Sequence, residues 1–155
     1  MNTHRSASFL RLLITLTRCP SSHSWSNATE GYAEILSEFI PGLQDLGGFS
    51  HVILIYHFHR QQNMKLGVTP FLNDKPHSVF ATRAPSRPNA IGLSVVKLNR
   101  IEGNRIYIDN PDMLNETPLL DIKPYVPQFD SFTDAEAGWL TSKNPDKTRS
   151  DNRFA

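Results

Sequence analysis

Residues 91–109 read IGLSVVKLNRIEGNRIYID and predict two β-strands joined by a tight turn. Apolar and β-branched residues dominate residues 91–101, and the return strand Arg105–Asp109 alternates polar with apolar side chains. Residues 102–104 (EGN) suit a hairpin turn, because glycine and asparagine adopt left-handed backbone conformations at low cost. This segment therefore predicts an antiparallel hairpin in a β-rich protein.

Further short strands are predicted at residues 32–35, 51–58, 78–82 and 119–122. Residues 52–56 (VILIY) form an unbroken β-prone run, which is typical of a strand buried on both faces. Many short strands at close spacing are typical of a barrel or a sandwich. We therefore expect a mainly β fold, a small β-barrel with short helical pieces.

Helical structure is expected to be scarce. Residues 36–46 predict one helical turn at most, because proline and glycine interrupt them. Residues 133–140 predict one short helix with Thr133 as its N-cap and Glu136 three positions later. Residues 60–77 are polar and predict a long surface loop.

The composition is that of one globular domain. The chain has 155 residues, of which 39% are hydrophobic and 20% charged, and its net charge is +1. Cys19 is the only cysteine, which excludes an intrachain disulfide and a thiolate metal cage. No apolar run approaches the roughly 20 residues that span a bilayer, so we expect a soluble, cytoplasmic protein without a membrane partner.

The first 29 residues contain no Asp or Glu and carry Arg5, Arg11 and Arg18 among many Ser and Thr. Such a start resembles an organelle transit peptide, or a segment that does not belong to the natural domain. We expect ordered structure to begin near Gly31. The chain is accordingly divided into an atypical leader (1–30), a β-barrel domain (31–140) and a polar tail (141–155).

Charge is distributed unevenly along the chain. Residues 60–100 hold seven Lys or Arg and one acid, whereas residues 101–136 hold eight acids and two bases. The basic segment is suited to contact phosphates, and a solvated loop surface is the alternative explanation.

Residues 80–94 read FATRAPSRPNAIGLS and combine a stiff loop with polar recognition groups. Prolines reduce the entropy that a loop loses when it is ordered. Arg83 and Arg87 offer planar donors to a carboxylate or phosphate, and Asn89 offers both a donor and an acceptor. The alternative is a proline-rich connection whose arginines face water.

Residues 112–127 read DMLNETPLLDIKPYVP and hold the second candidate group. Asp121 and Lys123 alternate with Leu120 and Ile122, so both are predicted on the same face of a strand. They either form a plain ion pair, or they accept a proton and position a phosphate. Tyr125 is suited to stack on a base, or to serve as a core aromatic.

Other sites are weakly supported. His57 and His59 are two residues apart on a predicted strand, but a catalytic zinc needs a third protein ligand and none has convincing spacing. We therefore expect no metal. The chain has neither a Gly-x-Gly-x-x-Gly motif nor a P-loop, so a Rossmann nucleotide site is not supported.

Three blocks resemble those of the TsaA-like (TrmO) family of tRNA methyltransferases. Residues 80–94 are similar to the family's FATRSPxRPNPIGLS signature, residues 119–127 to LDIKPYxP, and residues 46–51 (LGGFSH) to a third block. The resemblance covers residues 31–132, and two long signatures in the right order are far more specific than one short motif.

The resemblance implies a small non-Rossmann β-barrel that binds S-adenosylmethionine, usually as a homodimer. It implies methyl transfer to the exocyclic amine of threonylcarbamoyl-adenosine beside the tRNA anticodon. Catalytic roles would fall to Asp121, Lys123 and Tyr125, and substrate binding to Arg87 and Asn89. The cofactor contacts would be His59, Arg60, Arg83, Leu93, Asn115, Glu116, Thr117 and Pro118.

Three departures from the family pattern stand out. The family's opening strand is not evident before Gly31, Ala90 replaces a proline, and Asn115-Glu116-Thr117 replaces Asp-Gly-Thr. These changes favour a second hypothesis, a non-catalytic module that binds S-adenosylmethionine or RNA. The third hypothesis is a structural barrel that binds no ligand. An intramolecular ion pair of Arg83 would support this third hypothesis.

Overall fold

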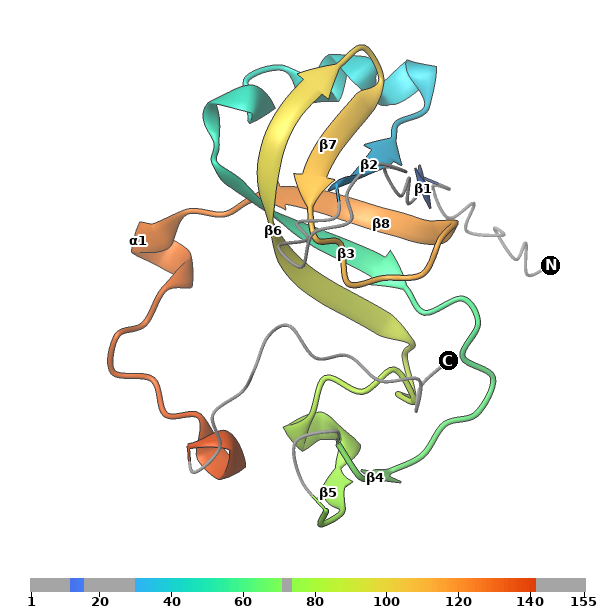
Figure 1. Ribbon diagram of the computed structural model, residues 1–155, viewed down its shortest axis with the longest axis vertical. Helices are drawn as coiled ribbons and strands as arrows, with labels where there is room; N and C mark the ends of the chain where they lie inside the picture. The colour runs from blue at the N-terminus through green and yellow to red at the C-terminus, as the bar shows by residue number, and fades with distance from the viewer. Residues whose placement is uncertain (1–11, 16–29, 71–73, 142–155) are drawn as a thin grey trace, which may run out of the picture. The chain divides into compact units, whose positions relative to one another are not determined.

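The computed structural model describes residues 12–15, 30–70 and 74–141. Strands of one sheet follow the order β1-β2-β7-β6-β3-β8, and β1 also pairs with β8, which makes a closed barrel (Figure 1). The predicted mainly β class is confirmed. The strands are β1 (Leu12–Thr15), β2 (Glu30–Glu34), β3 (His51–His57), β6 (Ile91–Glu102), β7 (Arg105–Asp109) and β8 (Thr117–Pro124).

Two compact units divide the chain. Unit 1 comprises Met1–His59 and Gly92–Tyr125 and carries the six-stranded sheet; unit 2 comprises Arg60–Ile91 and Val126–Ala155. Unit 2 contains a small sheet of β4 (Gly67–Val68) and β5 (His77–Ser78). Its helical turns are η3 (Val79–Ala81), α1 (Pro127–Asp130) and η4 (Gly138–Leu140).

The core of unit 1 comes from alternate residues of its strands. In β3, Val52, Leu54 and Tyr56 are buried, whereas Ile53 and Ile55 are half-buried on the opposite face. The prediction that this strand is buried on both faces was therefore wrong, because its second face is only partly covered. The buried cluster consists of Ala33, Ile35, Val52, Leu54, Tyr56, Val96, Leu98, Ile106, Ile108 and Leu119.

The predicted hairpin is confirmed as β6 and β7, joined by a turn in which Gly103 has a φ of 59°. A register shift lies between Leu98, which pairs with Ile108, and Arg100, which pairs with Tyr107. The intervening Asn99 is an extra residue on β6. Asn99 and Arg100 are consequently both exposed, although consecutive strand residues normally face opposite sides.

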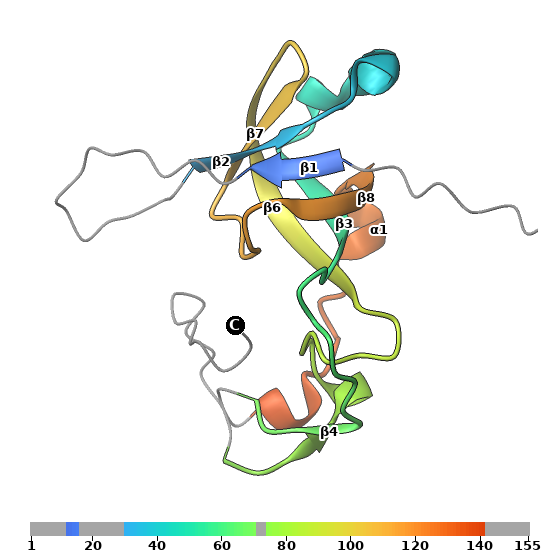
Figure 2. The ribbon, with the colours of Figure 1, turned by 90° about the vertical axis from the view of Figure 1, so that its right-hand side faces the viewer.

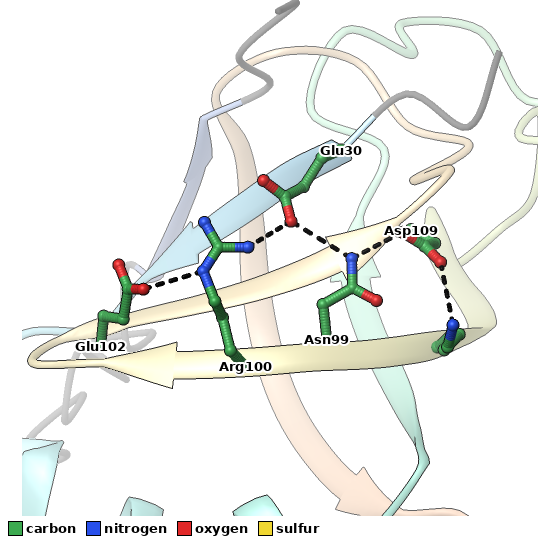
Figure 3. A network of polar contacts seen from close by, with 6 residues as sticks. Glu30, Asn99, Arg100, Glu102 and Asp109 are labelled. Atoms are coloured by element: carbon green, nitrogen blue, oxygen red, sulfur yellow. Dashed lines mark hydrogen bonds and ion pairs between the residues drawn. The ribbon is translucent and has the colours of Figure 1, made fainter.

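Polar contacts join β2, β6 and β7 on the outer face of the sheet (Figure 3). The Asn99 amide donates to Glu30 at 3.2 Å and to Asp109 at 2.6 Å. Arg100 pairs with Glu30 and, at 2.8 Å, with Glu102. Hydrogen bonds to these two carboxylates raise the pKa of Arg100 above its usual value, so the guanidinium stays charged.

The first strand was missed by the sequence prediction. β1 lies within the acid-free leader and pairs with both β2 and β8, so regular structure begins before Gly31 (Figure 2). Residues 1–11 and 16–29 of the leader, and residues 142–155 of the predicted tail, lie outside the described residues. Within the described ranges, no helix is long and apolar enough to cross a membrane.

Three further sequence predictions were wrong. Residues 78–82 are not a strand, because β5 ends at Ser78 and the 3-10 turn η3 follows. Residues 36–46 hold more helix than one turn, in η1 (Ser37–Leu43) and η2 (Leu46–Gly48). Residues 133–140 are not one helix, since only η4 is helical and its N-cap is Ala137.

Candidate functional site

The predicted site residues fall in both units. Unit 2 holds Arg60, Arg83, Arg87 and Asn89. Unit 1 holds His59, Leu93, Asn115, Glu116, Thr117, Pro118, Asp121, Lys123 and Tyr125.

In unit 2, Arg87 binds the loop that carries Arg83. Its Nη1 lies 3.0 Å from the carbonyl oxygen of Val79, 2.7 Å from that of Thr82 and 3.5 Å from that of Ala84. The Thr82 hydroxyl donates to the Val79 carbonyl at 3.0 Å and accepts from the Ala84 amide at 3.3 Å. These bonds replace a sheet ladder, which explains why the predicted strand is a turn. Arg87 as a substrate ligand stays a prediction.

Arg83 is exposed on this bonded loop. Its side chain makes no ion pair or hydrogen bond with any described residue, so its five donors are available to a ligand. The ion pair that would have supported a ligand-free barrel is thus absent from the described part of the chain. Arg60 and Asn89 are also exposed, and the Asn89 carbonyl accepts from the Ile91 amide at 2.7 Å.

In unit 1, the loop before β8 holds two non-glycine residues with positive φ, Asn110 and Glu116, of which Glu116 adjoins the strand. Glu116 is exposed and has a φ of 61°, in the left-handed region that the family's glycine adopts easily. Next to it, Thr117 is 3% exposed, and its hydroxyl donates to the Leu114 carbonyl at 2.7 Å. The loop thus keeps a glycine-type conformation despite the lost glycine.

Glu116→Gly is expected to raise the free energy of unfolding by about 0.5–1 kcal/mol, measured by urea denaturation. A left-handed conformation costs an L-residue about 1–2 kcal/mol, and the greater freedom of glycine in the unfolded chain offsets about 0.4–1 kcal/mol. The matched control is Asp112→Gly, at an exposed residue without a positive φ, which is expected to lower stability. Equal effects of the two substitutions would contradict this explanation.

On β8, Asp121 and Lys123 share a face, as predicted. The Lys123 Nζ lies 2.7 Å from Oδ2 of Asp121, and the Ile122 amide donates to Oδ1 at 2.9 Å. A β-bulge sets this face: Tyr56 pairs with Leu119 but Ile55 pairs with Asp121, so Leu120 is an extra residue. The two charged side chains therefore lie on the outer face of the sheet, and both are about half-exposed.

Three other unit 1 candidates lie in or just beyond strands. The Tyr125 amide donates to the His51 carbonyl at 3.1 Å, and the two rings meet edge to face at 6.2 Å. Leu93 is 47% exposed on β6. The His59 amide donates to the His57 carbonyl at 2.8 Å, in a tight turn just beyond β3.

The described residues contain no group of three or more His, Cys, Asp or Glu placed to hold a metal ion. His57 ends β3 and His59 follows in a turn, so the alternation of a strand does not bring their side chains to one face.

Sequence reasoning missed two aromatic residues at the turn that precedes Arg83. Phe80 is 72% exposed on η3, and Trp139 donates its Nε1–H to the Ala81 carbonyl at 2.8 Å. His77 stacks on the Trp139 ring at 4.3 Å. A contact between residues 58 positions apart leaves no periodic signal in the sequence, although Phe80 opens the quoted motif.

Comparison with known proteins identifies relatives over most of the chain. Residues 14–131 match the model of the tRNA-methyltransferase O N-terminal domain. A probable S-adenosyl-L-methionine-binding protein of Pyrococcus abyssi is 50% identical over 138 residues, which is 87% of this chain and 74% of that protein. Human tRNA (adenine(37)-N6)-methyltransferase is 45% identical over 92 residues, 57% of this chain and 21% of the human protein.

Solved structures are similar too. The crystal structure of TrmO from Pseudomonas aeruginosa has a TM-score of 0.64 and 35% identity, and the match covers 83% of this chain and 59% of that chain. Another TrmO crystal structure has a TM-score of 0.65 and 38% identity, with 82% and 60% coverage. The chain thus spans about three fifths of these structures and about a fifth of the human relative.

Proposed function

Because the chain belongs to the family of the tRNA-methyltransferase O N-terminal domain, we propose that it binds S-adenosylmethionine and methylates an adenine in tRNA. The finer proposal is that the acceptor is the exocyclic amine of threonylcarbamoyl-adenosine beside the anticodon. The proposal is supported by the 80–94 motif, which keeps most of the family's signature. In this motif Arg83 is exposed and pairs with none of the described residues, on a loop that Arg87 binds.

The residues present suit this cofactor. In unit 2, the planar guanidinium of Arg83 matches the carboxylate of the methionine moiety, and Arg60 adds a second cation. In unit 1, Leu93 supplies exposed apolar surface, and residues 115 and 116 end a loop that the buried Thr117, the first residue of β8, holds through its bond to Leu114. The proposed cofactor contacts are His59, Arg60, Arg83, Leu93, Asn115, Glu116, Thr117 and Pro118.

S-Adenosylmethionine, when bound, supplies an electrophilic methyl group on its sulfonium. The task of the chain is then alignment, because in-line displacement depends on the geometry of the reacting atoms. The adenine amine loses a proton as it is methylated, and we assign Asp121 as the acceptor of that proton. Lys123 holds the Asp121 carboxylate in place, and Tyr125 is assigned to stack on a base of the unpaired anticodon loop.

Arg83→Ala is expected to weaken S-adenosylmethionine binding about 10- to 150-fold, since a hydrogen bond to a charged group contributes about 1.5–3 kcal/mol. Calorimetric titration of the full chain measures this change. Lys65→Ala is the matched control, because it removes one exposed positive charge from the same unit and is expected to leave the affinity unchanged. No saturable binding by the unsubstituted chain would refute the proposed function.

Substrate identity needs a second measurement. Transfer of labelled methyl to tRNA that carries threonylcarbamoyl-adenosine, but not to tRNA that lacks it, would support the finer proposal. The predicted homodimer and cytoplasmic location stay predictions.

A non-catalytic S-adenosylmethionine-binding module is the second candidate function. It is favoured by the contacts of Asp121, whose two carboxylate oxygens are both engaged, one by Lys123 and one by the Ile122 amide. Cofactor binding without methyl transfer to any tRNA would select this candidate.

A further inference from the structure

The Phe80 side chain is exposed on a turn of unit 2, and the residues on either side of it are hydrogen-bonded to other parts of that unit. Its ring side chain is 72% exposed, whereas the preceding Val79 is 1% exposed. The Val79 amide donates to the Leu66 carbonyl at 2.8 Å, and the following Ala81 accepts from Trp139 at 2.8 Å. The exposure of Phe80 therefore belongs to an ordered turn rather than to a loose loop end.

A cation lies beside the exposed ring. The guanidinium carbon of Arg87 is 5.8 Å from the centre of the Phe80 ring, and Arg87 is itself bonded to the carbonyls of the loop. An aromatic face with an adjacent guanidinium is the combination on which unpaired bases stack, since every base has a π-face and a neighbouring phosphate. Arg83, three residues beyond Phe80, is also exposed.

The chain segment that carries Phe80 is basic, which favours a polyanion. Residues 60–91 contain five Lys or Arg and one acid, Asp74. Phe129 provides the opposite case within the same unit: it is 76% exposed, but residues 126–141 contain three acids and no Lys or Arg. Similar exposure thus occurs in two segments of opposite charge, and the basic segment that carries Phe80 is the one suited to phosphates.

We propose that Phe80 is a stacking platform for an unpaired base of the RNA substrate, with Arg87 beside it. This inference rests on the proposed tRNA methyltransferase function. It names a residue that binds the RNA substrate by stacking on one of its bases. Stacking on Phe80 requires a base outside a duplex. The platform therefore selects unpaired RNA without reading its sequence.

The test is a titration of the full chain with a fluorescein-labelled RNA stem-loop and with a fully paired RNA duplex, followed by fluorescence anisotropy. Phe80→Ala is expected to weaken stem-loop binding about 5- to 150-fold, the range of one base–aromatic stack. Duplex affinity is expected to stay unchanged. The slope of log Kd against log salt concentration is also expected to stay unchanged, because that slope counts phosphate contacts. Phe80→Tyr is expected to retain binding.

Phe129→Ala is the matched control and is expected to leave stem-loop binding unchanged. Equal effects of Phe80→Ala and Phe129→Ala, or no effect of either, would overturn the platform. So would a change in sedimentation coefficient in Phe80→Ala, since the ring would then contact a second copy of the chain. Weakened calorimetric binding of S-adenosylmethionine in Phe80→Ala would also overturn it, because the ring would then belong to the cofactor site.

Failure of the platform and failure of the proposed function are separable. Phe80-dependent binding of the stem-loop without methyl transfer would support the platform and refute the methyltransferase activity. Methyl transfer with stem-loop affinity that is independent of Phe80 would refute only the platform.

Discussion

Gly92→Ala is expected to lower the free energy of unfolding by about 2–3 kcal/mol, the upper part of the range for overpacked cores. Gly92 is buried on β6, and a Cβ atom there would lie 2.3 Å from Cε2 and 2.5 Å from Cζ of Tyr56. It would also lie 2.9 Å from Cζ of Phe58. Real Cβ atoms essentially never approach so closely, so a ring must move.

The Tyr56 ring has little room to move. It is 4% exposed, its hydroxyl is 3.1 Å from Oγ of Ser94, and Phe58 packs against it edge to face at 5.4 Å. Displacing the ring would break this hydrogen bond and disturb the core of unit 1. Packing against Tyr56 therefore explains why residue 92 is a glycine, independently of any ligand that the neighbouring residues bind.

Urea denaturation measures the effect of Gly92→Ala, and Gly47→Ala is its matched control. A Cβ at Gly47 would have no atom within 4 Å, so the control is expected to change stability by less than about 0.5 kcal/mol. The double variant with Tyr56→Leu is expected to lose less than the sum of the two single losses, because the residues share one space. Additive losses would show that the ring does not cause the effect.

Sequence reasoning predicted those parts of the fold that depend on local pattern. The β6–β7 hairpin follows from alternation and a turn with Gly103, and β3 from its β-prone run. The shared face of Asp121 and Lys123 also follows, because the two residues are two positions apart on one strand.

The errors arise where side-chain bonds, bulges or pairing partners outside the residue's own pattern decide the structure. Residues 78–82 have strand-like composition, yet Arg87 and the Thr82 hydroxyl take carbonyls that a strand would offer to a neighbour. The bulges at Asn99 and Leu120 interrupt the two-residue period, so the face of a side chain beyond them cannot be read from alternation. β1 was missed because a four-residue strand in a Ser- and Thr-rich segment is defined by its pairing with β2 and β8.

Asp121→Asn is expected to lower the single-turnover rate of methyl transfer to tRNA by about 10²- to 10⁴-fold, the usual contribution of a general base. Asparagine keeps the shape of the side chain but cannot accept the proton that the adenine amine loses. The affinity for S-adenosylmethionine is expected to stay unchanged, because Asp121 is assigned to the acceptor and not to the cofactor.

A loss of folding does not explain such a rate effect. The ion pair of Asp121 with Lys123 is about half-exposed, and exposed pairs contribute about 0–1 kcal/mol to stability. Asp109→Asn is the matched control: Asp109 lies 3.7 Å from Lys97 in another outer-face ion pair of unit 1. That control is expected to leave the rate unchanged. An equal rate in Asp121→Asn and the unsubstituted chain would show that Asp121 is not the general base and serves only in its ion pair. The proton of the amine would then be accepted by water or by the RNA itself.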